Sequence, residues 1–130
     1  MLDTASQHSF IAEHAAIRLG LPPLGSTVIA TQGFEQDTPT VATRPVVNVK
    51  LNSLYGKKPV NIMAVGHSAL ANITINRPQL SREDLDYVKS KDFPLCDLLL
   101  APQTPDLPIG TDHLFDLLED KPCKLPSGLY

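Results

Sequence analysis

Met1-Leu2-Asp3-Thr4-Ala5-Ser6-Gln7 begins the sequence and governs how the rest of it is interpreted. Two apolar residues precede a carboxylate, and small hydroxyl-bearing residues follow it. Such side chains bond to nearby backbone groups and favour turns, so this stretch can present one carboxylate as an acid/base group. The alternative is a helix N-cap, because Thr4 and Gln7 have capping-box spacing and Asp3 suits the positive end of a helix. Taken alone, these residues favour the cap.

Two motifs that lie far apart in the chain favour the turn instead. Residues 2–11, Leu-Asp-Thr-Ala-Ser-Gln-His-Ser-Phe-Ile, precede Arg-Leu-Gly-Leu at residues 18–21. Together they resemble the active-site segment of the retropepsin-like aspartic protease of Bel/Pao-type LTR retrotransposons. Residues 106–112, Asp-Leu-Pro-Ile-Gly-Thr-Asp, are similar to the Asp-Leu-Leu-Ile-Gly-x-Asp segment of that family. The resemblance covers roughly Met1 to Leu118.

The resemblance implies a fold, a domain boundary and an activity. The implied fold is mainly β, a retropepsin-like β-barrel with two or three short helices over residues 1–120. The prolines and glycine of residues 121–130 predict an extended tail after it. The implied activity is that of an aspartic endopeptidase which cleaves a retroelement polyprotein. Such enzymes need two carboxylates that share one proton. The other Asp-Thr pair, Asp37-Thr38, precedes a proline, so we expect the second carboxylate from another copy in a homodimer.

By the same resemblance, each expected site residue has a role. Asp3 is the catalytic residue, and the three residues after it complete the active-site turn. Thr4 would bond across to the turn of the partner. The other expected residues of the turn are Ala5 and Ser6, those of the supporting segment are Ile109 and Gly110, and those of the substrate-binding flap hairpin are Gly33, Phe34 and Glu35.

Three departures from the family pattern support an alternative function. Ala5 replaces a glycine, and Pro108 replaces an apolar residue that has a backbone N–H. Only Met1 and Leu2 precede Asp3, whereas family members have one or two strands there, so we expect the fold to lack those strands. The alternative is a catalytically degenerate or domesticated copy that binds protein without cleaving it.

Residues 65–70, Val-Gly-His-Ser-Ala-Leu, offer a minor alternative from another enzyme class. A strand followed by this pattern resembles the G-x-S-x-G nucleophile elbow of serine hydrolases, with Ser68 as nucleophile and Leu70 in place of the last glycine. Asp112 and His113 follow downstream, but adjacent residues cannot easily form the relay. The elbow also needs a large parallel sheet, which the hairpin pattern of this chain does not predict.

Composition limits the remaining possibilities for partners, cofactors and location. The 130 residues suit one domain, and a net charge of −3 gives no basic footprint for nucleic acid. Cys96 and Cys123 form neither a metal-spaced cluster nor a disulfide framework, so we expect reduced thiols, no metal or other cofactor, and a cytoplasmic location. No stretch has the length of a membrane span, and no signal leader is visible.

Periodicity predicts short elements throughout, in keeping with the 12 prolines. Helices are expected at residues 9–19, with Gly20 as the stop, at 81–89, with Ser81 as the cap, and at 111–119. Strands are expected at 27–31, 41–54, 60–65 and 96–100, and in the second of these Val47, Val49 and Leu51 alternate with polar residues. Residues 21–25 are expected to be a connector. The last helix is expected to pack on the core through an apolar face made of Leu114, Phe115, Leu117 and Leu118.

Overall fold

The computed structural model describes residues 1–32, 37–53, 58–68, 70, 79–92, 104–118 and 124–128. The chain divides into two compact units, named here the sheet unit (Met1–Ala71 and Asp106–Leu118) and the α2 unit (Asn72–Pro105 and Glu119–Tyr130). The sheet unit contains all the described strands and the α2 unit contains one helix. The elements are β1 (Phe10–Ala12), α1 (Glu13–Arg18), β2 (Pro23–Thr31), β3 (Thr40–Leu51), β4 (Val60–His67), α2 (Arg82–Ser90) and α3 (Thr111–Leu117).

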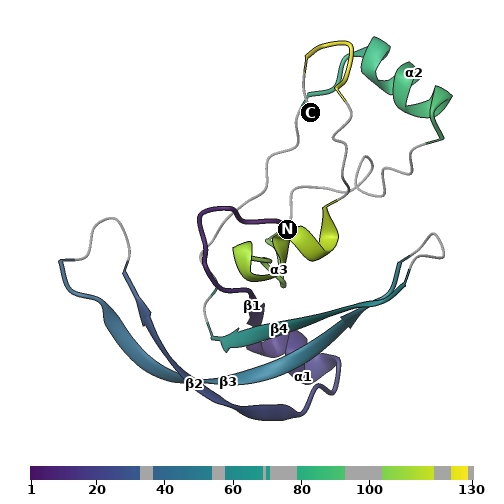
Figure 1. The fold of residues 1–130 in the computed structure, drawn as a ribbon. Coiled ribbons are helices and arrows are strands. Elements are labelled where there is room, and N and C mark those ends of the chain that lie inside the picture. The colour runs from purple at the N-terminus through teal and green to yellow at the C-terminus, as the bar shows by residue number, and fades with distance from the viewer. Residues whose placement is uncertain are drawn as a thin grey trace. The chain divides into compact units, whose positions relative to one another are not determined.

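The sheet unit is built on a mixed, four-stranded sheet of order β1-β4-β3-β2. Strand β1 runs parallel to β4, with Phe10 opposite Val65, whereas the other neighbours are antiparallel. Strands β2 and β3 form a long curved hairpin (Figure 1). The prediction of a mainly β fold with short helices is therefore confirmed, in the form of an open sheet.

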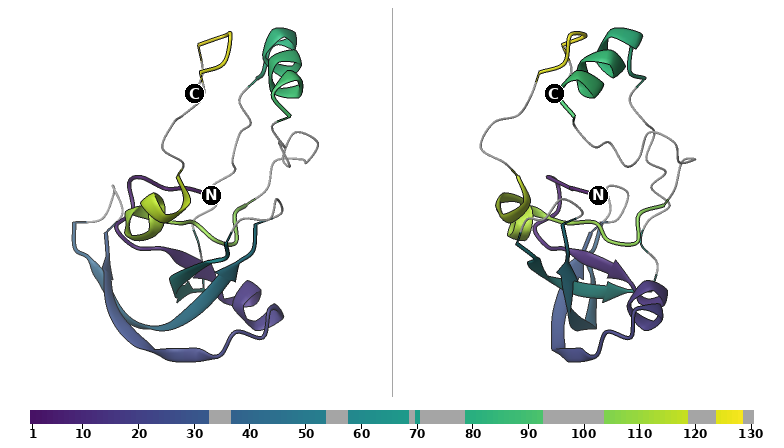
Figure 2. Two further views of the ribbon diagram at one scale, coloured as in Figure 1. Left: turned by 45° about the vertical axis from the view of Figure 1, so that its right-hand side comes forward. Right: turned by 90° about the vertical axis from the view of Figure 1, so that its right-hand side faces the viewer.

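Strand β3 shows why alternation predicted it. Val47 and Val49 are buried, while Asn48 and Lys50 between them are exposed. A strand sends successive side chains to opposite faces, so one face of β3 joins the core. The hydrophobic core consists of Ile11, Ala12, Ala15, Ala16, Val47, Val49, Ile62 and Ala64. Its members come from β1, α1, β3 and β4, and Figure 2 shows these strands lying between α1 and α3.

The predicted helix at residues 9–19 is wrong in its first part, because β1 precedes α1. The Phe10 N–H donates to the carbonyl of Pro108 (2.9 Å), and the Ala12 N–H donates to that of Asp106 (2.8 Å). These bonds and the pairing with β4 outweigh the helical spacing of the apolar residues. The predicted stop is confirmed, because Gly20 follows the helix with φ +64°.

Strand β2 begins at Pro23, inside the segment that was expected to be a connector. A proline can occupy the first position of a strand because no ladder bond is needed there. The register shifts between Pro23 and Gly25, where the strand is irregular. Pro45 lies in β3 opposite Ser26, and pairing with β4 begins at the next residue. Pro23 therefore lies on an edge strand of the described sheet, and Pro45 lies just beyond the last residue of β3 that pairs with β4.

Helix α3 buries a narrower face than its sequence predicts. Leu114 is buried and Leu117 is half-buried, but Phe115 is 82% exposed and Leu118 is also exposed. Helix α3 is only two turns long, so only the side chains directed at β4 and the core can be covered. The predicted packing is correct for Leu114 and wrong for Phe115.

In the α2 unit, Ser81 caps helix α2 as the sequence predicts. The Asp84 N–H donates to the Ser81 hydroxyl, and the Ser81 N–H donates to the Asp84 carboxylate (both 3.1 Å). The Ser127 N–H donates to the other Asp84 oxygen (3.0 Å). Residues 124–128 contain a turn and are bonded to α2, whereas an extended tail was expected. The domain boundary at residue 120 stays a prediction.

The hydrogen bonds to Asp84 predict that the contact between α2 and Ser127 depends on pH. The backbone N–H of Ser127 first, together with the bonds from Ser81, lowers the pKa of Asp84 against the opposing effect of burial. A carboxyl with a lowered pKa stabilises the fold at neutral pH, and the stabilisation is lost as pH falls through the folded-state pKa.

We therefore expect Asp84→Asn to accelerate hydrogen exchange of the Ser127 amide at neutral pH and to remove the acid-dependent part of its exchange. Asp86→Asn is the matched control, because Asp86 is exposed on the same helix. Equal protection of Ser127 in all three proteins would contradict the tie.

Candidate active site

Asp3 lies on a tight turn that its own carboxylate helps to close. The Ala5 N–H donates to Oδ1 of Asp3 (3.0 Å), and residues 4 and 5 form the turn. Asp3 is half-buried, whereas Thr4 and Ala5 are exposed. The N-cap interpretation of this stretch is wrong, because the first helix begins only at Glu13. The turn therefore presents a carboxylate beside an exposed surface.

Backbone bonds to residues 107–111 hold this turn on both sides. The Asp3 N–H donates to the Ile109 carbonyl, and the Ile109 N–H donates to the Met1 carbonyl (both 2.7 Å). These bonds make a parallel bridge between Leu2 and Ile109. Beyond the turn, the Thr111 N–H donates to the Ser6 carbonyl (2.9 Å). The two sequence motifs are therefore in direct contact.

Gly110 is buried, and the backbone of Ser6 and His8, which follow the turn, lies directly against it. A Cβ on Gly110 would lie 2.6 Å from the His8 carbonyl oxygen and 2.8 Å from that of Ser6. Both obstacles are backbone atoms, which cannot move aside as a flexible side chain could. Residue 110 must therefore be a glycine for the turn and the supporting segment to approach this closely.

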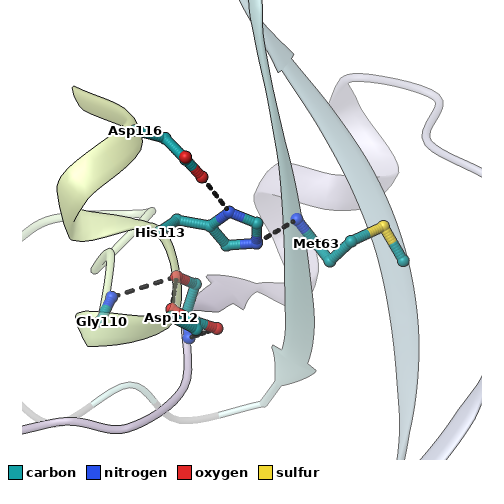
Figure 3. Close-up of polar contacts among 6 residues, drawn as sticks. Met63, Gly110, Asp112, His113 and Asp116 are labelled. Atoms are coloured by element: carbon teal, nitrogen blue, oxygen red, sulfur yellow. Dashed lines mark hydrogen bonds and ion pairs between the residues drawn. The ribbon is translucent and has the colours of Figure 1, made fainter.

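Ser9 and Asp112 join the same two segments through side chains. Ser9 is fully buried, and its hydroxyl donates to Oδ1 of Asp112 (2.6 Å) and accepts the Gly110 N–H (3.0 Å). The Ser9 N–H donates to Oδ2 of Asp112 (2.9 Å). Figure 3 shows Asp112 at the start of α3, beside Gly110. The sequence suggested Asp112 only as a poor relay partner of Ser68 and suggested no role for Ser9, although both residues lie within the quoted motifs.

Two departures from the family pattern fit the turn without strain. Among the described residues, Asp92 is the one non-glycine residue with a positive φ, so Ala5 has an ordinary backbone conformation. Pro108 is buried and uses its carbonyl to accept the Phe10 N–H. Neither Ala5 nor Pro108 therefore prevents the contact between the two motifs.

Several expected residues lie outside the described part of the chain. They are Gly33, Phe34 and Glu35 of the expected flap, and Cys96 and Cys123. The strands that lead to the expected flap are paired as far as Thr31, which lies opposite Thr40. The role of this hairpin as a flap stays a prediction.

Among the described residues, Ser68 makes no hydrogen bond to Asp112 or His113. Its hydroxyl lies 3.4 Å from Nη1 of Arg44. Asp112 is bonded to Ser9, and His113 is bonded to Asp116 and to the backbone of Met63. The Asp112–His113 pair, which as adjacent residues was not expected to form a relay easily, thus bonds to residues other than Ser68.

The described ranges contain ion pairs but show no cluster suited to a metal ion. No three His, Cys, Asp or Glu side chains in those ranges cluster so that they could hold a metal ion. Asp106, at the start of the second motif, pairs instead with His14 (2.9 Å) and Arg18 (3.2 Å) of α1. Of the helices in the part described, none is long and apolar enough to cross a membrane.

The known proteins provide no relative on which to base the site. A scan against protein-family models, a search of curated proteins and a search of solved structures each gave no match. The interpretation of the turn therefore depends on its motifs and on its contacts.

The tight approach at Gly110 makes a direct prediction about stability. We expect Gly110→Ala to lower the free energy of unfolding by about 1–3 kcal/mol, the usual cost of overpacking, because backbone atoms must shift. Thermal or denaturant unfolding measures this change. Gly25→Ala is the matched control, because its added Cβ meets nothing within 4 Å. If the two variants were equally stable, the close contact at Gly110 would be excluded.

Proposed function

We propose that this chain is one subunit of a retropepsin-like aspartic endopeptidase, with Asp3 as its catalytic carboxylate. The supporting observation is the contact between the two motifs, in which residues 107–111 bond to both sides of the Asp3 turn. The motifs are distant in sequence, so their contact is a property of the fold. The proposed substrate is a polypeptide, such as the polyprotein of a retroelement.

The chemistry requires two carboxylates in one site. One is ionised and takes a proton from water, which attacks the scissile carbonyl, while the protonated one hydrogen-bonds the carbonyl oxygen. Asp3 accepts the Ala5 N–H at Oδ1, and among the described contacts Oδ2 accepts no bond. Oδ2 is thus available to water or to a second carboxylate.

The second carboxylate is proposed to come from a second copy of the chain. The sequence has one Asp-Thr-Ala turn, and a twofold axis beside it would bring two Asp3 residues together. Thr4 and Ala5 are exposed, as residues that contact a symmetry mate must be in the isolated chain. Leu2 next to them is also exposed and would lie near the same contact.

A binding protein without protease activity is the second candidate, and Ala5 is the residue that favours it. Its exposed methyl group occupies the side of the turn where the partner would approach, and the family has glycine there. A dimer that binds peptides but does not cleave them would identify this second function. The ordinary backbone conformation of Ala5 favours the active enzyme.

The proposed activity predicts the effect of removing one carboxylate. We expect the wild-type chain to cleave a mixed peptide library at mildly acidic pH as a dimer. Asp3→Asn should reduce cleavage at least about a hundredfold, because positioned acid/base groups contribute about 10²–10⁴-fold. Asp86→Asn, which alters an exposed carboxylate of helix α2, should leave cleavage unchanged.

Cleavage that survives Asp3→Asn would contradict the proposal and would point to Ser68. A serine-reactive phosphonate that labels the wild type and not Ser68→Ala would then establish the hydrolase. Sedimentation in the same buffer separates an inactive monomer from an inactive dimer, since only the dimer brings two Asp3 residues together.

A further inference from the structure

His113 lies at the contact between helix α3 and strand β4 (Figure 3). Its Nε2 accepts the Met63 backbone N–H (3.1 Å), and its Nδ1 lies 3.1 Å from Oδ2 of Asp116. The side chain is only 18% exposed. A backbone N–H can only donate, so Nε2 is unprotonated and the ring proton is on Nδ1, where Asp116 accepts it. The contact therefore requires the neutral imidazole.

The Met63 N–H lies on a part of β4 that β1 does not cover. Strand β1 pairs with β4 only at Val65, Gly66 and His67, and Met63 is paired with Asn48 of β3 on its other side. An edge N–H that has no strand partner bonds to water or to another acceptor. His113 supplies that acceptor and so ties α3 to the sheet.

We propose that His113 is a pH-sensitive positioning residue for the Asp3 turn. Helix α3 begins directly after Gly110, and its Asp112 is bonded to Ser9, so the position of α3 affects the segment that holds the turn. Protonation places a hydrogen on Nε2, which then faces the Met63 N–H as a second donor. The tie is present when His113 is neutral and is lost as pH falls. The consequence for catalysis rests on the proposed function.

Among the described residues, the hydrogen bonds of His113 involve one charged group. Asp116 is an acidic residue of the same helix, and it keeps its bond to Nδ1 when the ring is protonated. Asp112 is directed to Ser9 instead. On β4, the titratable residue is His67, whose ring packs edge-on against Phe10. The titratable residues of the segment before β1 are Asp3 and His8, and those of β3 are Arg44 and Lys50. Protonated His113 is therefore held by its own helix and no longer by β4.

Hydrogen exchange of the Met63 amide tests the tie without any need for peptidase activity. His113→Gln keeps a side-chain oxygen that can accept the Met63 N–H at every pH, whereas His113→Leu removes the acceptor. At neutral pH we expect wild type and His113→Gln to protect Met63 alike, and His113→Leu to exchange roughly fivefold faster, as expected for one lost hydrogen bond. The Val49 amide of β3 is the internal reference.

At acidic pH, we expect the Met63 exchange of the wild type to rise to that of His113→Leu, while His113→Gln stays protected. Comparison of the proteins at equal pH removes the intrinsic pH dependence of exchange. A wild type that follows His113→Gln at every pH would overturn the proposal, as would unchanged protection in His113→Leu.

The pH profile of cleavage tests the link to Asp3. We expect His113→Gln to keep its activity at lower pH than the wild type, with cleavage by both lost on Asp3→Asn. Equal acid limbs, together with loss on Asp3→Asn, would overturn the positioning role and leave the proposed function intact. Absence of cleavage in every variant would remove the proposed function, and Met63 exchange would still decide whether His113 is the tie.

Discussion

The parallel contact between residues 1–3 and residue 109 is the constraint on which the sheet unit depends. Two backbone bonds of 2.7 Å join chain segments that are more than a hundred positions apart. Closing so long a loop costs conformational entropy, which must be offset by other contacts of the same segments. The buried hydroxyl of Ser9 and the carboxylate of Asp112 supply charge-assisted bonds at this place. The Asp3 turn is thus held by the fold as a whole.

The hydrogen bonds of β1 and of the residue before it connect this contact to the sheet. The Val65 N–H donates to the Ser9 carbonyl, and Phe10 is bonded to Pro108 on its other side. Strand β1 therefore lies between β4 and the second motif. A shift of β1 would move the residues that follow the Asp3 turn and the second motif, which is bonded to that turn. A carboxylate that performs acid/base chemistry needs such a rigid support, because its geometry must be set before the substrate arrives. The proposed catalytic role of Asp3 would use this support.

The sequence predicted an element correctly where neighbouring residues determine its structure. It failed where residues far along the chain determine that structure. Alternation around Val47 and the cap at Ser81 are local, and both predictions were correct. The strand at residues 10–12 was missed because a short apolar run fits a buried strand and a helix equally well, and only pairing with β4 decides. Phe115 was assigned to the core because helical spacing cannot tell how much surface a two-turn helix has to cover. The contact of Asp112 with Ser9 could be seen only after folding, although both residues belong to the motifs.

The central claim is that two Asp3 turns, each bonded to residues 107–111 of its own chain, form one site. Its most direct test is calorimetric titration with a peptide in which a secondary alcohol replaces the scissile carbonyl, because such analogues bind the arrangement that stabilises the transition state. We expect one analogue to bind per two chains, and binding to disappear in Asp3→Asn. One analogue bound per chain, or binding unaffected by Asp3→Asn, would contradict a shared site built from two copies of this turn.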